Sequence, residues 1–462
     1  MVHIGKSGLR VRSALTGGTC AMHTIRRDAN ERRFWRASSL LAVLAASVIV
    51  FLARDAIAQG TWTTGTDSPT ARRGEAAAAV NGILYAVGGA PPGSTSSVAT
   101  VEAYDPMTDT WTSKASMPVA SQQLTAGVIN GILYAAAGGG CCGAFNTLQA
   151  YDPTTDSWTL KPSMPTPRYG PAAGVVNDIL YVAGGGSGFG TIFANLEAFD
   201  PTTNGWTTKA PMPTGRSHLG IGVVNGILYA IGGANLAGTA LATVEAYDPA
   251  TNTWSTGASM PTARLGLTVD VIDGVLYAIG GLNSSGSLTT VEAYNPATDS
   301  WTSMTSMPVA RNFNSLASDP INGVLYVVGG KLPDTTSVLT VQIFTPVLFV
   351  KIDIKPGSDP NSINLGSVGV VPVAILSSAT FDATQVDAES VTLAGGAVRL
   401  IGRGSKYACS KEDINGDGVA DLVCHVETAQ FMIEPGSTSA VLTGTTFGGQ
   451  SIRGEDSIQI VQ

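Results

Sequence analysis

Five arginines stand at one fixed place in a repeated stretch of this chain, three residues after a proline in each copy. They are Arg72, Arg168, Arg216, Arg264 and Arg311. A guanidinium group presents a planar fork of donors that can hold a carboxylate through two parallel hydrogen bonds. If the five side chains meet at a common opening, they form a cationic funnel for a carboxylate, such as an acidic sugar or an acidic peptide side chain.

The same arginines have an alternative use inside the fold. Four of their repeats also contain a glutamate on a later predicted strand, namely Glu102, Glu197, Glu245 and Glu292. The one repeat without the arginine has Ser121 and Gln149 in these two places, so both partners are lost together. Only the last repeat, with Arg311 and Gln342, breaks the match. Because buried arginines are usually paired, this joint loss favours Arg–Glu pairing within or between repeats over ligand binding.

A short acidic segment near the C-terminus has the spacing of a calcium loop. Oxygen-bearing side chains occupy positions 1, 3, 5 and 9, with a glycine at position 6, in Asp413, Asn415, Asp417, Asp421 and Gly416. The carbonyl of Val419 would supply position 7, and Ca²⁺ prefers six to eight oxygen ligands. We expect a structural Ca²⁺ here. Position 12 is Cys424 instead of glutamate, so the segment resembles the loops of dockerin and FG-GAP modules, and a plain Asp/Asn/Gly turn is the alternative.

The cysteines are few and fall into pairs. Five occur in 462 residues, and Cys20 lies in the segment that an export signal would remove. Cys409 and Cys424 could form a disulfide, which exported proteins retain. Cys141 and Cys142 are adjacent and could be either a vicinal disulfide or two free thiols. No CxxC pattern for a metal is present.

A repeated unit carries the arginines. The doublet Gly-Gly recurs at Gly88, Gly138, Gly184, Gly232, Gly280 and Gly329, with spacings of 50, 46, 48, 48 and 49 residues. A Leu-Tyr pair or its equivalent precedes each doublet, and an aromatic residue, Asp-Pro or Asn-Pro, and then Trp follow five of them. A fixed period in this range is typical of a repeat fold.

The unit resembles the kelch motif over about residues 59 to 346. Kelch repeats are four-stranded blades of a β-propeller, so the resemblance implies six blades. Asn-Gly pairs such as Asn81-Gly82 favour type I′ hairpin turns between two strands of each unit. The sixth unit has no Trp after Phe344-Thr345-Pro346, whereas an unpaired Trp62 precedes the first unit. We therefore predict that the N-terminal strand completes the sixth blade and removes an open sheet edge.

The chain divides into three predicted parts. Residues 1–58 contain a basic stretch, an apolar run and Ala56-Ile57-Ala58, which together read as an export signal, and translation could begin at Met22. An uncleaved anchor is the alternative to cleavage. Residues 59–347 form the propeller, and residues 348–462 form a small β-sandwich that resembles a module of exported bacterial proteins. The predicted fold class is all-β.

Composition and strand order narrow the partners. A net charge of −8 argues against nucleic acid, which requires a basic footprint. We expect a secreted, periplasmic or cell-surface protein without a transmembrane span after signal removal. Strand alternation places the arginine segments and the variable loops after each Gly-Gly doublet on one face. We expect recognition there, at Phe145, Asn146, Phe189, Phe193, Asn195, Asn235, Asn283 and Lys331.

Two functions follow from these observations. The first is an exported, non-enzymatic binding scaffold that uses the loop-rich propeller face for a protein or glycan ligand. The second is a carbohydrate-active propeller for acidic sugars, resembling the kelch-type sialic acid mutarotases. The propeller contains one histidine, His218, so the several-histidine copper site of kelch oxidases cannot be built, and no catalytic residues of any known class can be assigned.

Overall fold

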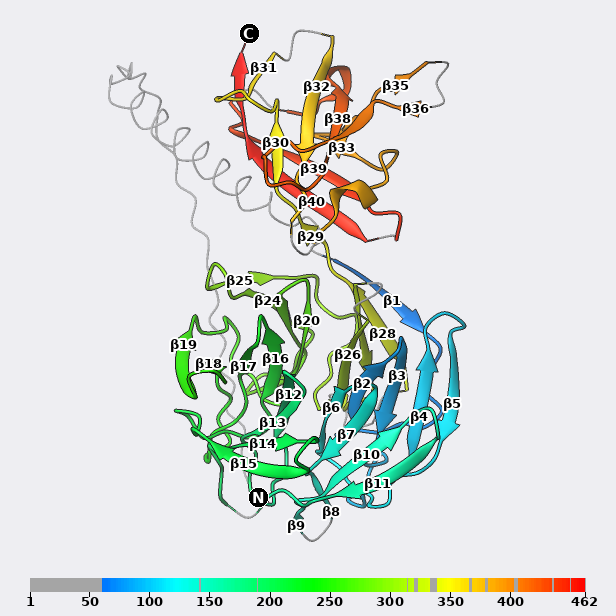
Figure 1. Ribbon diagram of the computed structural model, residues 1–462, viewed down its shortest axis with the longest axis vertical. Helices are drawn as coiled ribbons and strands as arrows, with labels where there is room; N and C mark the ends of the chain where they lie inside the picture. Colours follow the sequence, from blue (N-terminus) through cyan, green and yellow to red (C-terminus); the bar gives the residue numbers. More distant parts are fainter. Residues whose placement is uncertain are drawn as a thin grey trace, which may run out of the picture. The chain divides into compact units, whose positions relative to one another are not determined.

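The computed structural model describes residues 60–461, except 141–142, 189, 314, 320–322, 333–338, 365–367, 379–380, 403–405, 434–435 and 449 (Figure 1). Side chains of 315–319 are likewise outside the description. The expected export signal with Met22, the pair Cys141 and Cys142, and Phe189 therefore lie outside the described residues.

Residues 61–345 form six four-stranded antiparallel sheets, counted over the described part of the chain. Blade 1 contains β2 (Ala76–Val80), β3 (Ile83–Val87), β4 (Val101–Asp105) and β5 (Thr110–Lys114). Blade 2 contains β6 (Thr125–Ile129), β7 (Ile132–Ala136), β10 (Leu148–Asp152) and β11 (Ser157–Lys161), with the short β8 (Gly139–Gly140) and β9 (Gly143–Ala144). Blade 3 contains β12 (Ala172–Val176), β13 (Ile179–Ala183), β14 (Leu196–Asp200) and β15 (Gly205–Lys209).

The other three blades repeat this order. Blade 4 contains β16 (Gly220–Val224), β17 (Ile227–Ile231), β18 (Val244–Asp248) and β19 (Thr253–Gly257). Blade 5 contains β20 (Thr268–Ile272), β21 (Val275–Ile279), β24 (Val291–Asn295) and β25 (Ser300–Ser303), with the short β22 (Leu282–Asn283) and β23 (Gly286–Ser287). Blade 6 contains β26 (Ser315–Asp319), β27 (Val324–Val328), β28 (Val341–Thr345) and β1 (Thr61–Gly65).

The N-terminal strand closes the ring, as the sequence predicts. β1 pairs antiparallel with β28, with Trp62 opposite Phe344 and their rings 4.8 Å apart. The Trp62 indole also donates a hydrogen bond to the carbonyl of Thr305 in the loop that precedes blade 6, at 2.9 Å. The missing tryptophan of the sixth repeat is thus supplied from the other end of the propeller sequence.

The inner strands form a closed circle. β2, β6, β12, β16, β20 and β26 each contact the next one, and β26 contacts β2 (Figure 1). Each hydrophobic cluster between them combines two adjacent blades; Tyr181 of blade 3, for example, packs with Leu228 and Tyr247 of blade 4. A blade therefore buries its apolar faces only against its neighbours, which makes ring closure necessary for a complete core.

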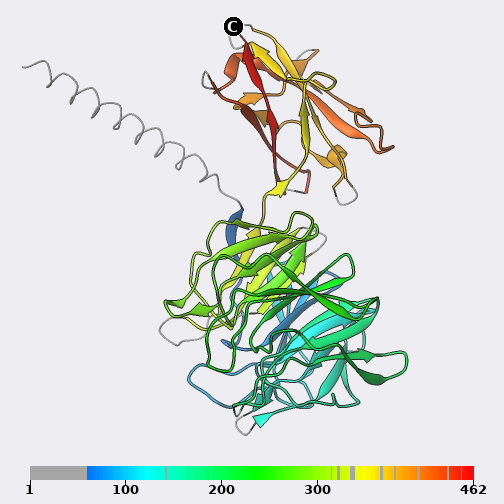
Figure 2. The same cartoon turned by 90° about the vertical axis from the view of Figure 1, so that its left-hand side faces the viewer.

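Residues 348–461, yellow to red in Figures 1 and 2, pair only among themselves within the described part of the chain. One sheet has five strands, in the order β29 (Leu348–Phe349), β40 (Ser451–Ser457), β39 (Ser439–Thr445), β33 (Thr392–Leu393) and β34 (Gly396–Ala397). A second has four, in the order β30 (Ile352–Ile354), β32 (Val370–Ile375), β38 (Asp421–Glu427) and β37 (Cys409–Glu412).

Smaller elements complete this part. They are the pairs β31 (Ser362–Asn364) with β41 (Gln459–Val461) and β35 (Leu400–Ile401) with β36 (Lys406–Tyr407), and the 3₁₀ turns at Ala383–Gln385 and Thr428–Gln430. One hydrophobic core unites both larger sheets, with Ile354 and Val373 from one sheet and Leu442 and Ile452 from the other. This is the two-layer arrangement of a β-sandwich. None of the described helices is long and apolar enough to span a membrane.

Candidate functional site

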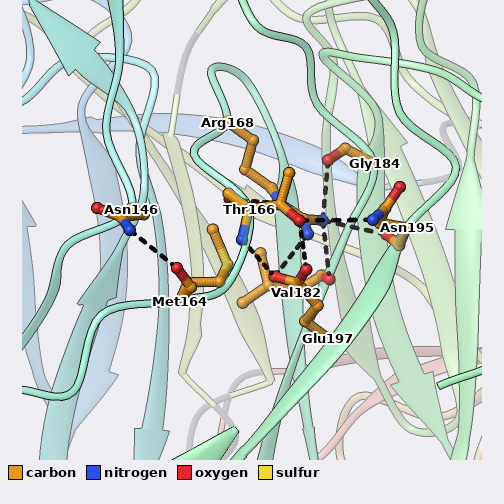
Figure 3. A network of polar contacts seen from close by, with 8 residues as sticks. All are labelled: Asn146, Met164, Thr166, Arg168, Val182, Gly184, Asn195 and Glu197. Atoms are coloured by element: carbon orange, nitrogen blue, oxygen red, sulfur yellow. Dashed lines mark hydrogen bonds and ion pairs between the residues drawn. The ribbon is translucent and has the colours of Figure 1, made fainter. Parts of the chain in front are cut away.

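Arg168 shows how the repeated arginines are used (Figure 3). Its side chain is fully buried and forms an ion pair with Glu197 at 2.7 Å. Its Nη1 donates to the carbonyls of Gly184 and Asn195 at 3.2 and 3.1 Å, and the hydroxyl of Thr166 donates to Glu197 at 2.6 Å. The arginine therefore joins the segment that enters blade 3 to the end of its second strand and the start of its third.

Three other blades repeat this pair. Arg72 contacts Glu102 at 2.6 Å, Arg216 contacts Glu245 at 2.6 Å and Arg264 contacts Glu292 at 2.7 Å, all with both side chains buried. In each, Nη1 also donates to the carbonyl of the first glycine of the doublet: Gly88, Gly232 and Gly280. Burial lowers the pKa of Arg264 to about 10, and the charge of Glu292 opposes this lowering. The guanidinium groups act as internal braces.

Blade 2 replaces the ion pair with neutral groups. The Ser121 hydroxyl donates to the carbonyl of Ala137 at 3.0 Å. Gln149 accepts from the backbone N–H of Val119 at 2.8 Å and donates to its carbonyl at 3.2 Å. In this repeat, side chains that hydrogen-bond to backbone groups therefore take the place of the Arg–Glu ion pair.

Blade 6 obtains its negative charge from blade 1. Nη1 of Arg311 donates to the carbonyls of Gly329 and Thr340, both at 3.1 Å. Burial lowers the pKa of Arg311 to about 10, and the negative charge of Glu75 opposes this lowering. Glu75 is 5 % exposed, and its carboxylate packs against Gly329, where a Cβ would clash with it. Glu75 therefore compensates Arg311 in place of the glutamate that Gln342 replaces.

All five arginines are at most 2 % exposed. This geometry corresponds to the pairing alternative, because a funnel for a ligand requires guanidinium groups that reach solvent. Ligand binding by the five stays a prediction that the geometry does not support. The sequence missed Glu75, since its partner lies in a different repeat.

A closed ring of backbone hydrogen bonds surrounds the central channel, two residues after each arginine position. Gly74, Gln123, Gly170, His218, Gly266 and Phe313 each donate to the carbonyl of the preceding member, at 3.0, 2.6, 3.0, 2.7, 2.8 and 2.8 Å, and Gly74 donates to Phe313. All six have a left-handed backbone, with φ between 50° and 63°. The ring satisfies backbone groups that would otherwise lack partners at the channel edge.

Glycine alternates with a large side chain around this channel ring. A Cβ at Gly74 would lie 2.7 Å from the Gln123 amide, one at Gly170 would lie 2.7 Å from the His218 ring, and one at Gly266 would lie 2.9 Å from the Phe313 ring. The three large side chains therefore lie over the three glycines. His218 and Phe313 meet edge to face with ring centroids 5.1 Å apart.

A cavity of about 150 Å³ lies at the channel ring and the first residues of the inner strands. Its polar side chains, within the described lining, are Glu75, Gln123, Thr125, His218 and Thr268. Burial lowers the pKa of His218 to about 4, so the imidazole is neutral near pH 7. Its Nδ1 lies 3.1 Å from the Ser217 hydroxyl, which leaves Nε2 for other contacts.

These cavity residues were only partly foreseen, since the sequence singled out His218 alone. The signal was present: two residues after the arginine, the six repeats have Gly, Gln, Gly, His, Gly and Phe in turn. The alternation predicts contacts between large side chains and glycines only after the repeats are arranged in a ring.

Several predicted recognition residues shape their own loops. Asn146 donates to the carbonyl of Met164 at 3.0 Å, and Asn195 donates to the Thr166 hydroxyl at 3.5 Å. Asn235 accepts from the N–H groups of Ala237 and Thr239 and Asn283 from that of Ser285, as in Asx turns. Phe145, Phe193 and Lys331 are half-buried, whereas Leu236 is 66 % exposed.

The expected calcium loop is a tight turn between β37 and β38. The Asp413 carboxylate accepts from the backbone N–H groups of Gly416, Asp417 and Gly418 at 2.8, 3.2 and 3.0 Å. The Asn415 amide donates a hydrogen bond to the Asp417 carboxylate at 3.0 Å. The side chains of Asp413, Asn415 and Asp417 are all exposed. Val419 is 44 % exposed. Four of the five expected ligands thus share one exposed turn.

The fifth, Asp421, has a different place. It is fully buried, and its two oxygens accept from the N–H groups of Ser377 and Ile414 at 2.7 and 3.0 Å. Asp421 anchors the turn to the sandwich. Among the described residues no cluster of three or more His, Cys, Asp or Glu side chains is arranged around a metal position. The set fits Ca²⁺ in part, because position 9 of such loops often acts through water.

A disulfide closes the same hairpin. Cys409 and Cys424 stand opposite each other on β37 and β38 and are joined through their sulfurs. This agrees with the expected pairing.

Comparison with known proteins supports a kelch-like propeller. The family model "Attractin/LZTR1 beta-propeller" matches residues 142–350, and the model "Kelch motif" matches residues 71–118. The solved structure of YjhT superposes with a TM-score of 0.53 at 18 % identity, covering 63 % of this chain and 97 % of that one. At this identity the likeness concerns the fold alone. No curated protein matches the chain.

Proposed function

We propose that this chain is an exported, non-enzymatic binding scaffold, whose kelch-like propeller presents its loop-rich face to a protein partner. The carrying observation is that all five repeated arginines are buried braces. Within the described cavity lining, Glu75 is the sole carboxylate, and its charge compensates Arg311. The loops after the Gly-Gly doublets differ between repeats, so they would determine which partner binds.

The test uses two exposed leucines. Leu236 lies in the blade 4 loop of the proposed face and is 66 % exposed, whereas Leu160 lies on the outer strand β11 and is 57 % exposed. Proteins enriched by residues 59–462 from an envelope extract would be purified and titrated. Leu236→Asp should weaken binding about tenfold, and Leu160→Asp should leave it unchanged. Equal affinity of both variants and the unchanged chain would contradict the proposed face.

The alternative is a carbohydrate-active propeller for acidic sugars, such as an enzyme like the kelch-type sialic acid mutarotases. The observation that favours it is that the carboxylate of Glu75 and the imidazole of His218 both belong to the cavity lining. NMR of freshly dissolved sialic acid would detect accelerated anomer exchange, and Glu75→Gln should abolish it. A glycan array with sialic and uronic acids would be measured beside it, with Arg216→Ala as the arginine variant.

We also propose a structural Ca²⁺ in the turn of Asp413, Asn415, Asp417 and Val419, with Asp421 as anchor. The shared exposed turn and the buried anchor support it. The ion would stiffen the hairpin that the Cys409–Cys424 disulfide closes. Export through the signal in residues 1–58 belongs to the same proposal, because an oxidising, calcium-rich setting suits both features.

A further inference from the structure

The channel cavity has properties that the scaffold function does not use. On a measure by which one water needs about 10–15 Å³, its volume of about 150 Å³ admits a small molecule. Gln123, His218 and Phe313 also hold left-handed backbones, which cost a side-chain-bearing residue about 1–3 kcal/mol, where blades 1, 3 and 5 have glycine. The chain keeps these side chains in the channel despite that cost.

The charges around the cavity indicate an uncharged ligand. No lysine or arginine belongs to its described lining, and the single carboxylate, Glu75, compensates Arg311. Arg73, next to the channel ring, donates to the carbonyl of Ser94 at 3.0 Å instead. A buried charge without a partner is strongly disfavoured, so a carboxylate or an ammonium group would be excluded here.

The polar groups of the cavity both donate and accept hydrogen bonds. The Gln123 amide and the hydroxyls of Thr125 and Thr268 line the same space. His218 has Nε2 available beyond its contact with Ser217. The Phe313 ring, which meets the His218 ring edge to face, adds apolar surface. Hydroxyl groups on a carbon ring match this mixture of donors, acceptors and apolar surface.

We infer that the channel cavity binds a small, uncharged polyhydroxy compound of monosaccharide size or smaller. The binding groups are Gln123, Thr125 and His218, with Phe313 as apolar surface. The inference does not rest on the proposed protein-binding face. It differs from the acidic-sugar alternative in the charge of the ligand.

The experiment is a saturation-transfer NMR screen of residues 59–462 against neutral monosaccharides and polyols at millimolar concentration, followed by calorimetric titration. The screen includes galactose with galacturonate and glucose with glucuronate as matched pairs. A neutral member should bind, and its uronate should bind at least about tenfold more weakly. Gln123→Leu should weaken the neutral ligand about tenfold, whereas Gln459→Leu on the exposed edge of β41 should not.

Thr125→Val keeps the shape of the side chain and serves as a second variant if Gln123→Leu does not fold. Absence of binding across the neutral panel would overturn the inference. Unchanged affinity in a folded Gln123→Leu or Thr125→Val chain would do the same. Preferential binding of a uronate would also overturn it and support the acidic-sugar alternative.

Discussion

A buried guanidinium stabilises a fold only when its charge and its donors are satisfied together. At the residue scale this propeller solves the problem in three ways. Arg168 pairs with Glu197 in its own blade, Ser121 and Gln149 avoid the charge, and Arg311 is compensated by Glu75 from the neighbouring blade. The third solution couples blade 6 to blade 1, at the place where the ring closes.

This coupling predicts a rescue. Glu75→Gln leaves the charge of Arg311 uncompensated and should lower the free energy of unfolding by about 3 kcal/mol, as expected when one partner of a buried pair is removed. Gln342→Glu places a carboxylate where blades 1, 3, 4 and 5 have one, so the double variant should recover at least half of that loss. Denaturant unfolding of both single variants and the double one measures this. Additive effects would show that Glu75 does not serve Arg311.

His218 predicts a pH dependence of stability. Its folded pKa is about 4, below the ordinary value of 6.5, because burial disfavours the imidazolium. Between these values the unfolded chain binds a proton that the folded chain does not. Stability should therefore fall as pH drops from about 6.5 to about 4, by at most about 3 kcal/mol from this residue.

His218→Gln isolates that contribution, and blade 2 already accepts a glutamine, Gln123, at the equivalent place. The variant should lose about 3 kcal/mol less than the unchanged chain over the same pH range. Other titrating groups cancel in this difference. Parallel pH profiles for the two chains would mean that burial does not lower the pKa of His218.

At the residue scale the sequence predicted the contacts whose two residues recur together in the repeats, and it missed the contact that occurs once. Joint loss of arginine and glutamate in one repeat indicated their contact. Glu75 was missed because the charge it balances is about 240 positions away in sequence and in another repeat. The roles of Gln123 and Phe313 could not be predicted either, since each acts with residues of other repeats that meet it around the channel.

At the element scale the decisive strand is β1. The other five blades are continuous in sequence, whereas blade 6 depends on a strand from the opposite end of the propeller. The sequence was sufficient here, because the missing tryptophan and the surplus Trp62 form a complementary pair. The hairpin turns were also predicted correctly from the Asn-Gly pairs. Asn81 and Gly82 have φ of 51° and 77°, as a type I′ turn requires.

Removing residues 59–64 should therefore expose the edge of β28 and reduce the free energy of unfolding by several kcal/mol. A synthetic peptide of residues 59–65, added in trans, should restore the thermal midpoint by adding a strand to that edge. The same peptide with Trp62→Ala lacks the packing on Phe344 and should restore little. A shortened chain as stable as the full one would contradict this role of β1.

At the scale of the whole molecule, a propeller built from internal pairs is joined in sequence to a sandwich that has its own core. The propeller core is divided between adjacent blades, so its stability depends on an intact ring. The sandwich has one core and one disulfide-closed hairpin. A ligand that binds this hairpin should therefore change the stability of the sandwich and leave the contacts between blades unchanged.

Calcium binding at the Asp413 turn tests this separation. If Ca²⁺ binds the folded sandwich and not the unfolded chain, a free concentration a hundredfold above Kd stabilises the sandwich by about 2.7 kcal/mol. Thermal unfolding in calcium and in chelator should then differ, and Asp417→Ala should remove the difference. Asp382→Ala is the control, because this exposed carboxylate caps a 3₁₀ turn through the N–H of Thr384 in the same sandwich and should leave the calcium effect intact. An equal midpoint with and without calcium, or a calcium effect that survives Asp417→Ala, would leave the turn as hydrogen-bonded backbone held by Asp421.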